Sequence, residues 1–458
     1  MAETFRIGLT GLNAATSDLS VTANNIANAN TTGFKYSRAE FSDIFSNSAL
    51  GQATRRTVGS GVQLAAVTQQ FKQGNINATG NPLDIAIDGE GFFKIQAENG
   101  TISYTRAGTF GVDSDGYVVT STGSKLQGFP ADVDGNIVVG AAQSMLLQTA
   151  DIQPRQTSDV EFGINLDAAA NAIDSSITPF DPTDPKTYNY TTSATIYDSL
   201  GGSHTLSTYF VKNPLSGTSG NTQSDWTVYG TLDGVYQVPT DPAQPVSASN
   251  PLIPAINFDP TAASPSGSMN LTFDDHGLLD QSVVSQLTAR DISIQVQAVE
   301  GVLGKPTSAT EPLQLSLDFL TATQFGGQSS TNNLVQDGYA SGTLVGVNVS
   351  DSGIMFGRYT NGQSKVLGQV ALFNFRNVQG LSPVGDTAWA ETSSSGQAIS
   401  GPPGSARLGM IRGGALEGSN VEMSDQLVNM IQAQRNFQAN AQVIQTADQL
   451  TQTLLQIR

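Results

Sequence analysis

The stretch LTGLNAATSDLSVTANNIANANTTGFK, residues 9–35, joins a helical apolar rhythm to a sudden polar tract. Large apolar residues recur at every seventh position of this region: Phe5, Leu12, Leu19 and Ile26. This period predicts an amphipathic helix over residues 2–30. Residues 24–34 then consist mainly of Asn, Thr, Ala and Gly, and we predict that Gly33 terminates the helix.

A second helix with the same period is predicted at the other end of the chain, over residues 419–458. Ser419 and Glu422 have the spacing of a capping box, with Ser419 as the N-cap. The apolar positions of this helix are Met423, Leu427, Met430, Phe437, Val443, Ile444, Leu450, Leu454 and Ile457. At about 1.5 Å per residue, such a helix would be a rod about 60 Å long.

Neither terminal helix is expected to be stable alone. Burial of the N-terminal stripe would contribute roughly 6–12 kcal/mol, whereas ordering the backbone costs about 1 kcal/mol or more per residue. The two helices are therefore predicted to pair. An ordinary intramolecular hairpin of helices and an assembly with further helices both fit this periodicity.

Two features favour assembly. Asn and Gln occupy faces where a solvated helix usually carries Lys and Glu. Small residues would also allow close approach of further helices: Gly8, Gly11, Ala14, Ala15, Ala433, Ala439 and Ala441. The predicted assembly interface comprises Phe5, Leu12, Leu19, Ile26, Met423, Leu427, Met430, Phe437, Ile444, Leu450, Leu454 and Ile457.

The composition excludes several classes of partner. Among 458 residues only 13% are charged, and 21 Lys and Arg face 39 Asp and Glu, for a net charge of −18. Because an acidic field repels phosphate, nucleic acid is not an expected partner. No apolar run reaches the roughly 20 residues that span a bilayer, so no membrane insertion is expected. The first 20 residues lack the pattern of a cleaved secretory signal.

The middle of the chain is predicted to consist of β-strands. Short apolar or alternating runs are separated by Asn-Gly, Asp-Gly and Gly-Gly turns: LDIAIDG, GFFKIQ, GYVVT, NIVVG and VLGQVALFNF. Residues 158–330 hold most of the Pro residues and both His, so we interpret them as an inserted domain. The fold class is thus a mainly β multidomain protein with β-domains nested by insertion, and with long terminal helices that pair as a coiled-coil-like inner domain.

The predicted domains follow from these zones. They are a helical inner domain (1–30 and 419–458), a linking segment (31–71 and 400–418), a β-rich domain (72–157 and 331–399) and an inserted outer β-domain (158–330).

Catalytic and metal-binding patterns are sparse. His204 and His276 are the only His residues, there is no Cys, and no Gly-x-Ser-x-Gly elbow occurs. Both His are predicted to lie in loops. We therefore expect no enzymatic activity, no cofactor and no metal. The stretches DSDGYV, from Asp113, and DVDGNIV, from Asp132, lack the Glu that closes an EF-hand loop and are predicted to be hairpin turns.

Two further short patterns are weak. GEGFF, residues 89–93, lacks the third Gly and the helix of a dinucleotide site. Arg55 and Arg56 form a basic pair that could bind an acidic neighbour, but a solvated position is the better interpretation.

Both termini resemble the bacterial flagellar axial family of rod, hook and hook-associated proteins. The resemblance rests on residues 9–35 and on ALEGSNVEMSDQLVNMIQAQRNFQANAQVIQTADQ, residues 415–449. ATIYDSLGGSHTL (194–206), GLSPVGDTAW (380–389) and the segment 333–375 resemble the hook members of the family specifically. The likeness is weakest over about 210–270.

This resemblance implies a structural subunit of the flagellar hook. Such a subunit self-assembles into a flexible hollow tube, a universal joint that transmits torque from rod to filament during motility. It implies an extracellular location at the hook and basal body, reached through the flagellar type III export apparatus without a cleaved signal peptide. Implied partners are further copies of the chain and the rod, hook-cap and hook–filament junction proteins. Terminal regions in the family are disordered in monomers and order in the tube.

Three other interpretations remain open. A distal rod protein shares both terminal signatures, but rod proteins generally lack a large inserted domain. A hook–filament junction protein is disfavoured by the hook-like segment 333–375. A secreted β-rich adhesin or glycan-active protein would explain the middle zone but not the paired terminal helices, and a carbohydrate cleft usually shows more than two Trp.

Overall fold

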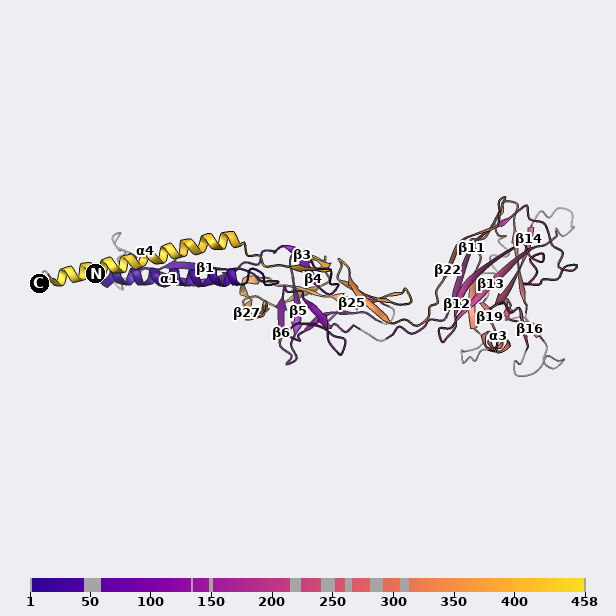
Figure 1. The fold of residues 1–458 in the computed structure, drawn as a ribbon, viewed down its shortest axis with the longest axis horizontal. Coiled ribbons are helices and arrows are strands. Elements are labelled where there is room, and N and C mark those ends of the chain that lie inside the picture. Colours follow the sequence, from indigo (N-terminus) through magenta and orange to yellow (C-terminus); the bar gives the residue numbers. More distant parts are fainter. Residues whose placement is uncertain are drawn as a thin grey trace. The chain divides into compact units, whose positions relative to one another are not determined.

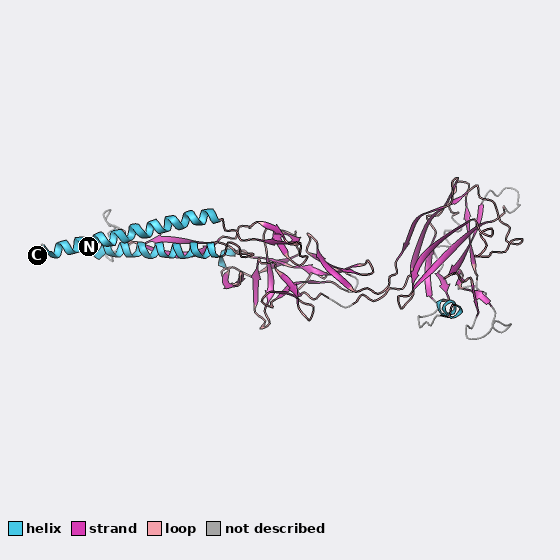
Figure 2. Ribbon diagram, in the orientation of Figure 1, coloured by secondary structure: helices cyan, strands magenta, loops and turns pink. Residues whose placement is uncertain are grey.

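The computed structural model describes residues 2–44, 59–132, 135–147, 151–214, 224–239, 252–259, 266–280, 291–304 and 313–456. The chain divides into two compact units. Unit 1 comprises Met1–Thr149 and Leu344–Arg458, and unit 2 comprises Ala150–Thr343. Most regular structure in both units is β-strand, and the two long helices belong to unit 1 (Figures 1 and 2). Arg55 and Arg56 lie outside the described residues.

Unit 1 begins and ends with the long helices α1 (Ala2–Ala27) and α4 (Met423–Gln456), which lie side by side (Figure 1). Its first strands are β1 (Ser37–Asp43), β2 (Val62–Gln69), β3 (Ile76–Ala78), β4 (Ile85–Asp88), β5 (Phe92–Gln96), β6 (Ile102–Thr105), β7 (Phe110–Val112), β8 (Val118–Thr120), β9 (Lys125–Pro130) and β10 (Gln143–Ser144). The returning chain adds β23 (Leu344–Val349), β24 (Ile354–Tyr359), β25 (Ser364–Val370), β26 (Leu372–Asn374), η1 (Val378–Gly380), β27 (Ser382–Gly385), β28 (Ala388–Ala390), β29 (Ile399–Gly401), β30 (Met410–Gly413) and β31 (Ala415–Glu417).

The main sheet of unit 1 mixes strands from both stretches of the chain. Its path runs β23-β24-β25-β9-β5-β6-β28-β27, and β7, β8, β10, β26 and β29 pair beside it. Every pair in it is antiparallel, as the turn-rich sequence requires. Three two-stranded pairs stand apart, namely β1-β2, β3-β31 and β4-β30. The last two join the N-terminal stretch to the segment that leads into α4.

In its described residues, unit 2 contains two larger sheets and the short helix α3. Its elements are β11 (Asp159–Asp167), β12 (Tyr190–Tyr197), β13 (Ser203–Lys212), β14 (Ser224–Leu232), β15 (Gln237–Pro239), β16 (Leu252–Pro254), β17 (Ile256–Asn257), β18 (Ser268–Phe273), β19 (Asp291–Ile294), α3 (Val296–Val302), β20 (Leu313–Asp318), β21 (Thr323–Phe325) and β22 (Ser330–Gln336). One sheet runs β17-β19-β20-β11-β21 with β22 beside β11, and the other runs β12-β13-β14-β18. Both contribute to one core, which includes Phe162, Phe210, Trp226 and Phe319.

The predicted fold class is confirmed at its coarse level: the chain is mainly β, and its terminal helices pack together. Both helix boundaries differ from the prediction. α1 ends at Ala27, after which Ala29 N–H bonds to Ile26 O and Thr31 N–H bonds to Asn28 O in i→i−3 turns, and Gly33 lies beyond them with φ +70°. Gly33 therefore does not terminate the helix. Its positive φ and its contact with the backbone of Arg106 and Ala107 explain the glycine.

The predicted cap of the second helix is wrong. α4 begins at Met423, and Glu422 O accepts its first intrahelical bond from Gln426 N–H. Ser419 instead accepts a hydrogen bond at Oγ from Val421 N–H in the segment before the helix. The spacing of a capping box was present, but Asn420 is held by other segments of the chain, and this delays the helix.

The strand and turn predictions have mixed outcomes. The Gly-containing turns at Asp113 and Asp132 are confirmed, since each Asp Oδ1 accepts the amide four residues on and Gly116 and Gly135 have positive φ. NIVVG forms only an isolated bridge at Ile137, and Val138 and Val139 are exposed.

The two His residues have different surroundings. His276 lies in an exposed turn, as predicted. The prediction that His204 lies in a loop is wrong. It is buried on β13, where Nδ1 lies 3.0 Å from Asp233 Oδ2 and Nε2 lies 3.7 Å from Asp198 Oδ2.

In unit 2, Asp337 ties the end of β22 to the chain before β11. Its carboxylate accepts bonds from Ser158 N–H at 2.8 Å and from Asp159 N–H at 3.0 Å, and pairs with Arg155 Nη2 at 2.9 Å. Partial burial alone would raise the pKa of Asp337, but a hydrogen bond from Ser158 Oγ, the two backbone bonds and the charge of Arg155 outweigh it and hold that pKa below its usual value of 3.8.

We expect Asp337→Asn to destabilise unit 2 by about 1–2 kcal/mol at neutral pH, because amide donors lose a charged acceptor. Since the folded pKa is depressed, the carboxylate's contribution is present above pH 3.8 and is lost as the pH falls below it. The difference between wild type and variant should therefore shrink below pH 3.8. This difference in stability is measured by hydrogen exchange of the β11 amides in the full chain. Glu161→Gln, on the same strand, is the matched control for the loss of one carboxylate charge.

Candidate assembly interface

The terminal helices run antiparallel and meet along a seam of small and polar residues. A Cβ atom on Gly8 would lie 2.9 Å from Ile444 Cγ1, and one on Gly11 would lie 2.4 Å from Asn440 Oδ1. Asn25, near the other end of α1, bonds to Gln426 near the start of α4. The glycines thus allow an approach that a larger side chain would prevent.

The seam follows its own seven-residue period, shifted by three positions from the predicted apolar stripe. In α1 the positions are Gly8, Ala15 and Thr22, and in α4 they are Gln426, Ala433, Asn440 and Ala447. Ala15, Thr22, Gln426, Ala433 and Ala447 are buried. The predicted stripe and this seam together have the a and d spacing of a heptad repeat. Only the set with the smaller residues is buried within one subunit.

The residues predicted as the interface are largely left uncovered. Phe5, Met423, Leu427, Phe437 and Leu450 are exposed, with Leu450 at 59%. The others are only half-buried: Leu12, Leu19, Ile26, Met430 and Ile444. The side chains of Leu454 and Ile457 lie outside the described residues.

The β1-β2 hairpin lies against α1 and forms the wall of a groove. Val62 N–H donates to Thr10 Oγ1 at 3.4 Å, and Gly61 has φ +115° where it approaches the same threonine. A groove of about 470 Å³ lies between the hairpin and the two helices. Its floor consists of small residues, Gly11, Ala14 and Ala439, and Phe41 stands at its side. This groove has the size to receive large side chains from another polypeptide.

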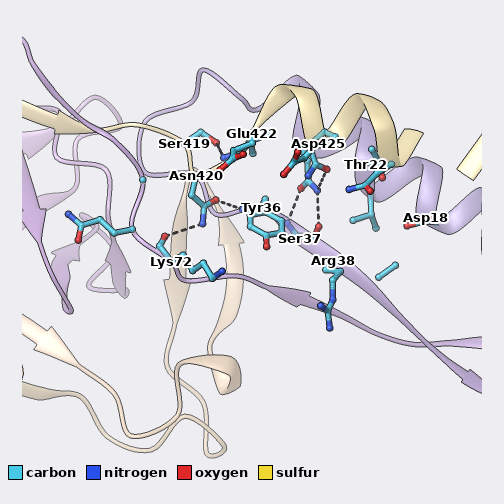
Figure 3. Close-up of a pocket in the computed structure, with 18 of the residues that line it drawn as sticks. Asp18, Thr22, Tyr36, Ser37, Arg38, Lys72, Ser419, Asn420, Glu422 and Asp425 are labelled. Atoms are coloured by element: carbon cyan, nitrogen blue, oxygen red, sulfur yellow. Dashed lines mark hydrogen bonds between the residues drawn. The ribbon is translucent and has the colours of Figure 1, made fainter. Parts of the chain in front are cut away.

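At the base of the helices is a polar cleft of about 420 Å³, shown in Figure 3. Asn25 Nδ2 donates to Ser37 O at 2.7 Å, and Asn25 Oδ1 accepts from Ser37 N–H at 2.8 Å. Asn420 Oδ1 accepts from Tyr36 N–H at 2.8 Å (Figure 3). Asp18 lines the same cleft, and burial raises the pKa of its carboxyl. The amide side chains fix the point where α1 turns into β1 and where α4 begins.

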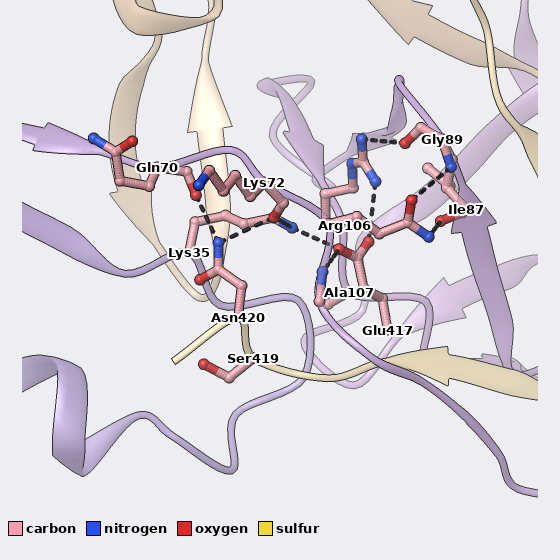
Figure 4. Close-up of polar contacts among 12 residues, drawn as sticks. Lys35, Gln70, Lys72, Ile87, Gly89, Arg106, Ala107, Glu417, Ser419 and Asn420 are labelled. Atoms are coloured by element: carbon pink, nitrogen blue, oxygen red, sulfur yellow. Dashed lines mark hydrogen bonds and ion pairs between the residues drawn. The ribbon is translucent and has the colours of Figure 1, made fainter. Parts of the chain in front are cut away.

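Beneath the cleft lies a buried charge cluster, which we call the Glu417 node (Lys35, Arg106 and Glu417; Figure 4). Glu417 Oε1 pairs with Lys35 Nζ at 2.5 Å, and Glu417 Oε2 pairs with Arg106 Nη1 at 3.0 Å. The side chains of Lys35 and Glu417 are fully buried, and that of Arg106 is 5% exposed. Burial lowers the pKa of Lys35, and the charge of Glu417 opposes that effect.

Backbone groups complete the Glu417 node. Lys35 Nζ also donates to Lys72 O at 2.7 Å, Arg106 Nη2 donates to Gly89 O at 2.8 Å, and Gly74 N–H donates to Glu417 Oε1 at 2.9 Å. The node therefore joins five separate stretches of unit 1: the exit from α1, the chain before β3, the turn after β4, the loop after β6 and the strand before α4.

Sequence reasoning missed the amide contacts and the Glu417 node. The seam carried a readable signal, because Gly8, Ala15 and Thr22 repeat with the same period as the apolar stripe. The sequence gives no such signal for the Glu417 node, since Lys35, Arg106 and Glu417 are isolated charges far apart in the chain.

Glu417→Gln tests the Glu417 node. The variant leaves two buried cations without a carboxylate, so we expect it to destabilise unit 1 by about 3–5 kcal/mol. Trp226 belongs to unit 2 and Trp389 to unit 1, so urea unfolding followed by fluorescence in a Trp226→Phe background reports on unit 1. Glu422→Gln, at an exposed position, should change the free energy of unfolding by less than about 0.5 kcal/mol.

Within the described ranges, no helix combines the length and apolar character of a membrane crossing. Among those residues, one group could supply three metal ligands, the turn residues Asp274, Asp275 and His276, and we assign it no function.

Four protein families match successive parts of the chain. Residues 5–35 match the flagella basal body rod protein family, and residues 86–177 match the flagellar hook protein FlgE/F/G D1 domain. Residues 165–339 match the flagellar basal body protein FlaE D2 domain, and residues 412–457 match the C-terminal region of the flagellar basal body rod FlgEFG proteins. The first and last matches contain most of α1 and α4.

Full-length relatives are flagellar hook proteins. The chain is 36% identical to flagellar hook protein FlgE of Salmonella typhimurium over 99% of this chain and 100% of that protein. It is 35% identical to FlgE of Escherichia coli, again over 99% and 100% of the two chains. The crystal structure of Helicobacter pylori flagellar hook protein FlgE2 matches 74% of this chain and 100% of that one, with a TM-score of 0.50 and 15% identity, and so supports the fold. The chain belongs to the flagellar hook protein family and is a structural component of the flagellar hook.

Proposed function

We propose that the chain polymerises into a hollow, flexible tube whose inner wall is built from α1 and α4 of many copies. This proposal rests on one observation: of the two sets of heptad positions in α1 and α4, one is buried within the subunit and the other is left largely exposed. One subunit buries its small seam residues and leaves large apolar residues such as Phe5 and Phe437 exposed. Apolar stripes of this kind gain stability when a second helix covers them.

The groove beside the helices supports the same proposal. Its floor of Gly and Ala is shallow enough for a neighbouring helix to insert large side chains. We propose that coiled-coil-like packing between copies fills it, and that the residues predicted as the interface make these contacts.

We further propose the finer divisions read from the sequence. These are the helical inner domain at 1–30 and 419–458, the linking segment at 31–71 and 400–418, the β-rich domain at 72–157 and 331–399, and the inserted outer domain at 158–330. The tube would act as a universal joint that transmits torque from rod to filament. Its partners would be the rod, hook-cap and hook–filament junction proteins, and the type III apparatus would export the chain without a cleaved signal.

Low charge content fits a joint that bends during rotation. With only 13% charged residues, the outer surfaces meet through neutral polar groups, which exchange partners with less cost than desolvated ion pairs.

Electron microscopy tests assembly directly. Phe437→Asp places a charge on the exposed apolar stripe of α4, whereas Gln438→Asp places the same charge one residue on, at an exposed polar position. We expect tubes from the wild type and from Gln438→Asp, and none from Phe437→Asp or from a chain lacking residues 1–30. Tubes of normal length from Phe437→Asp would contradict the proposed interface.

Hydrogen exchange tests how ordering depends on assembly. Because the intrasubunit seam buries mainly Ala, Thr and Gln, it contributes little toward the backbone entropy of two long helices. We expect α1 and α4 amides to exchange rapidly in dilute monomer and at least about a hundredfold more slowly in tubes. Core strands such as β9 and β25 should be protected in both states. Strong protection of α1 in the monomer would contradict coupled ordering.

A further inference from the structure

Unit 1 holds an apolar cleft, away from the terminal helices, that the described residues leave unfilled. The cleft has a volume of about 620 Å³ and is lined by Phe71, Phe92, Phe375, Val378 and Leu408. Phe92 packs edge-on against Phe71, at 5.7 Å, and against Phe375, at 6.0 Å, so the floor is a rigid aromatic cluster. Ile399 stands at the cleft and is 65% exposed.

The floor of this cleft is fixed by the Glu417 node. The Arg106 guanidinium lies 5.3 Å from the centre of the Phe92 ring while it pairs with Glu417. A cation held over an aromatic face restrains the ring. The cleft is therefore preformed, which lowers the entropic cost of binding.

Arginines give the cleft mouth a charge opposite to that of the chain. Arg376 and Arg407 line the cleft and are exposed, whereas Glu90 in the same lining already accepts a hydrogen bond from Asn374 Nδ2 at 3.2 Å. In the part of the chain that the structure describes, neither has an ion-pair or hydrogen-bond partner for its guanidinium. The chain as a whole carries a net charge of −18. Two unpaired arginines on such a chain are positioned to attract another acidic surface.

We propose that this cleft, defined by Phe71, Phe92, Phe375, Ile399, Arg376 and Arg407, receives a second copy of this chain. The inserted surface has an apolar residue for the aromatic floor and a carboxylate for the arginines. The chain offers this chemistry on two exposed hairpins. Ile102 is 42% exposed near Glu98, and Val112 is 42% exposed near Asp115. This inference rests on the proposed polymerisation and adds to it a contact between β-domains.

A cross-linking experiment identifies the occupant. The chain has no Cys, so Ile399→Cys in the full chain provides a single attachment site for a photoreactive maleimide. Tubes are assembled from equal amounts of ¹⁵N-labelled and unlabelled protein, irradiated and digested. We expect cross-links that join a labelled to an unlabelled peptide, with an Asp or Glu in the captured peptide. Tubes that yield only cross-links within one copy, or none, overturn the inference and leave polymerisation intact.

Charge reversal gives an independent test. The double variant Arg376→Glu/Arg407→Glu should raise the protein concentration needed for assembly by about tenfold or more, because like charges then face each other. The control Arg358→Glu reverses an exposed arginine on β24, outside the cleft, and should leave that concentration within about twofold. If the double variant assembles like Arg358→Glu, the cleft is not an interface. Failure of the unmodified chain to assemble would instead count against the proposed function.

Discussion

The buried ion cluster around Glu417 is the constraint on which the rest of unit 1 depends. A single carboxylate pairs with two buried cations, and the backbone carbonyls of Lys72 and Gly89 each accept one further hydrogen bond from them. A buried charge without such partners is strongly destabilising, so all three side chains must be in place together. This requirement fixes the exit from α1, the loop after β6 and the strand before α4 relative to one another. The aromatic floor of the neighbouring cleft depends on the same cluster through Arg106.

The helices above the Glu417 node are built on a different principle. Their contact within one subunit uses glycine, alanine and amide side chains, which allow close approach but bury little apolar area. The larger residues of the repeat are arranged on the adjoining face. A helix pair of this composition has a well-defined geometry, but its contacts contribute little to the free energy of folding. Additional helices would supply the missing stabilisation without changing the pair, because their contacts involve different side chains.

Much of this organisation follows from the sequence. The seven-residue period at both ends, and the Gly-punctuated strands between them, predict a mainly β chain with paired terminal helices. The details that failed depend on long-range contacts. The cap at Ser419 fails because Asn420 bonds to Tyr36 and Gln70, far away in the chain. His204 lies on β13, where Asp198 and Asp233 from two turns and Glu300 from α3 surround its buried ring. The Glu417 node could not be predicted from the sequence for the same reason, since no local pattern distinguishes the buried Lys35 from a solvated lysine.

The combination of a strong node and a weak helix pair has a mechanical consequence. The proposed joint would require a subunit that holds its shape under torque while its contacts with neighbours change during bending. Buried ion pairs with backbone partners are costly to break, so unit 1 keeps its shape where α1 and α4 enter it. The helix pair lacks such contacts along its seam, and its stability would come from neighbouring copies. Deformation is then expected between subunits, at apolar and neutral polar surfaces that can slide, and not within the β-domain. The arginine-lined cleft on that domain would be a separate contact that does not slide, because Arg106 links Phe92 in its floor to Glu417.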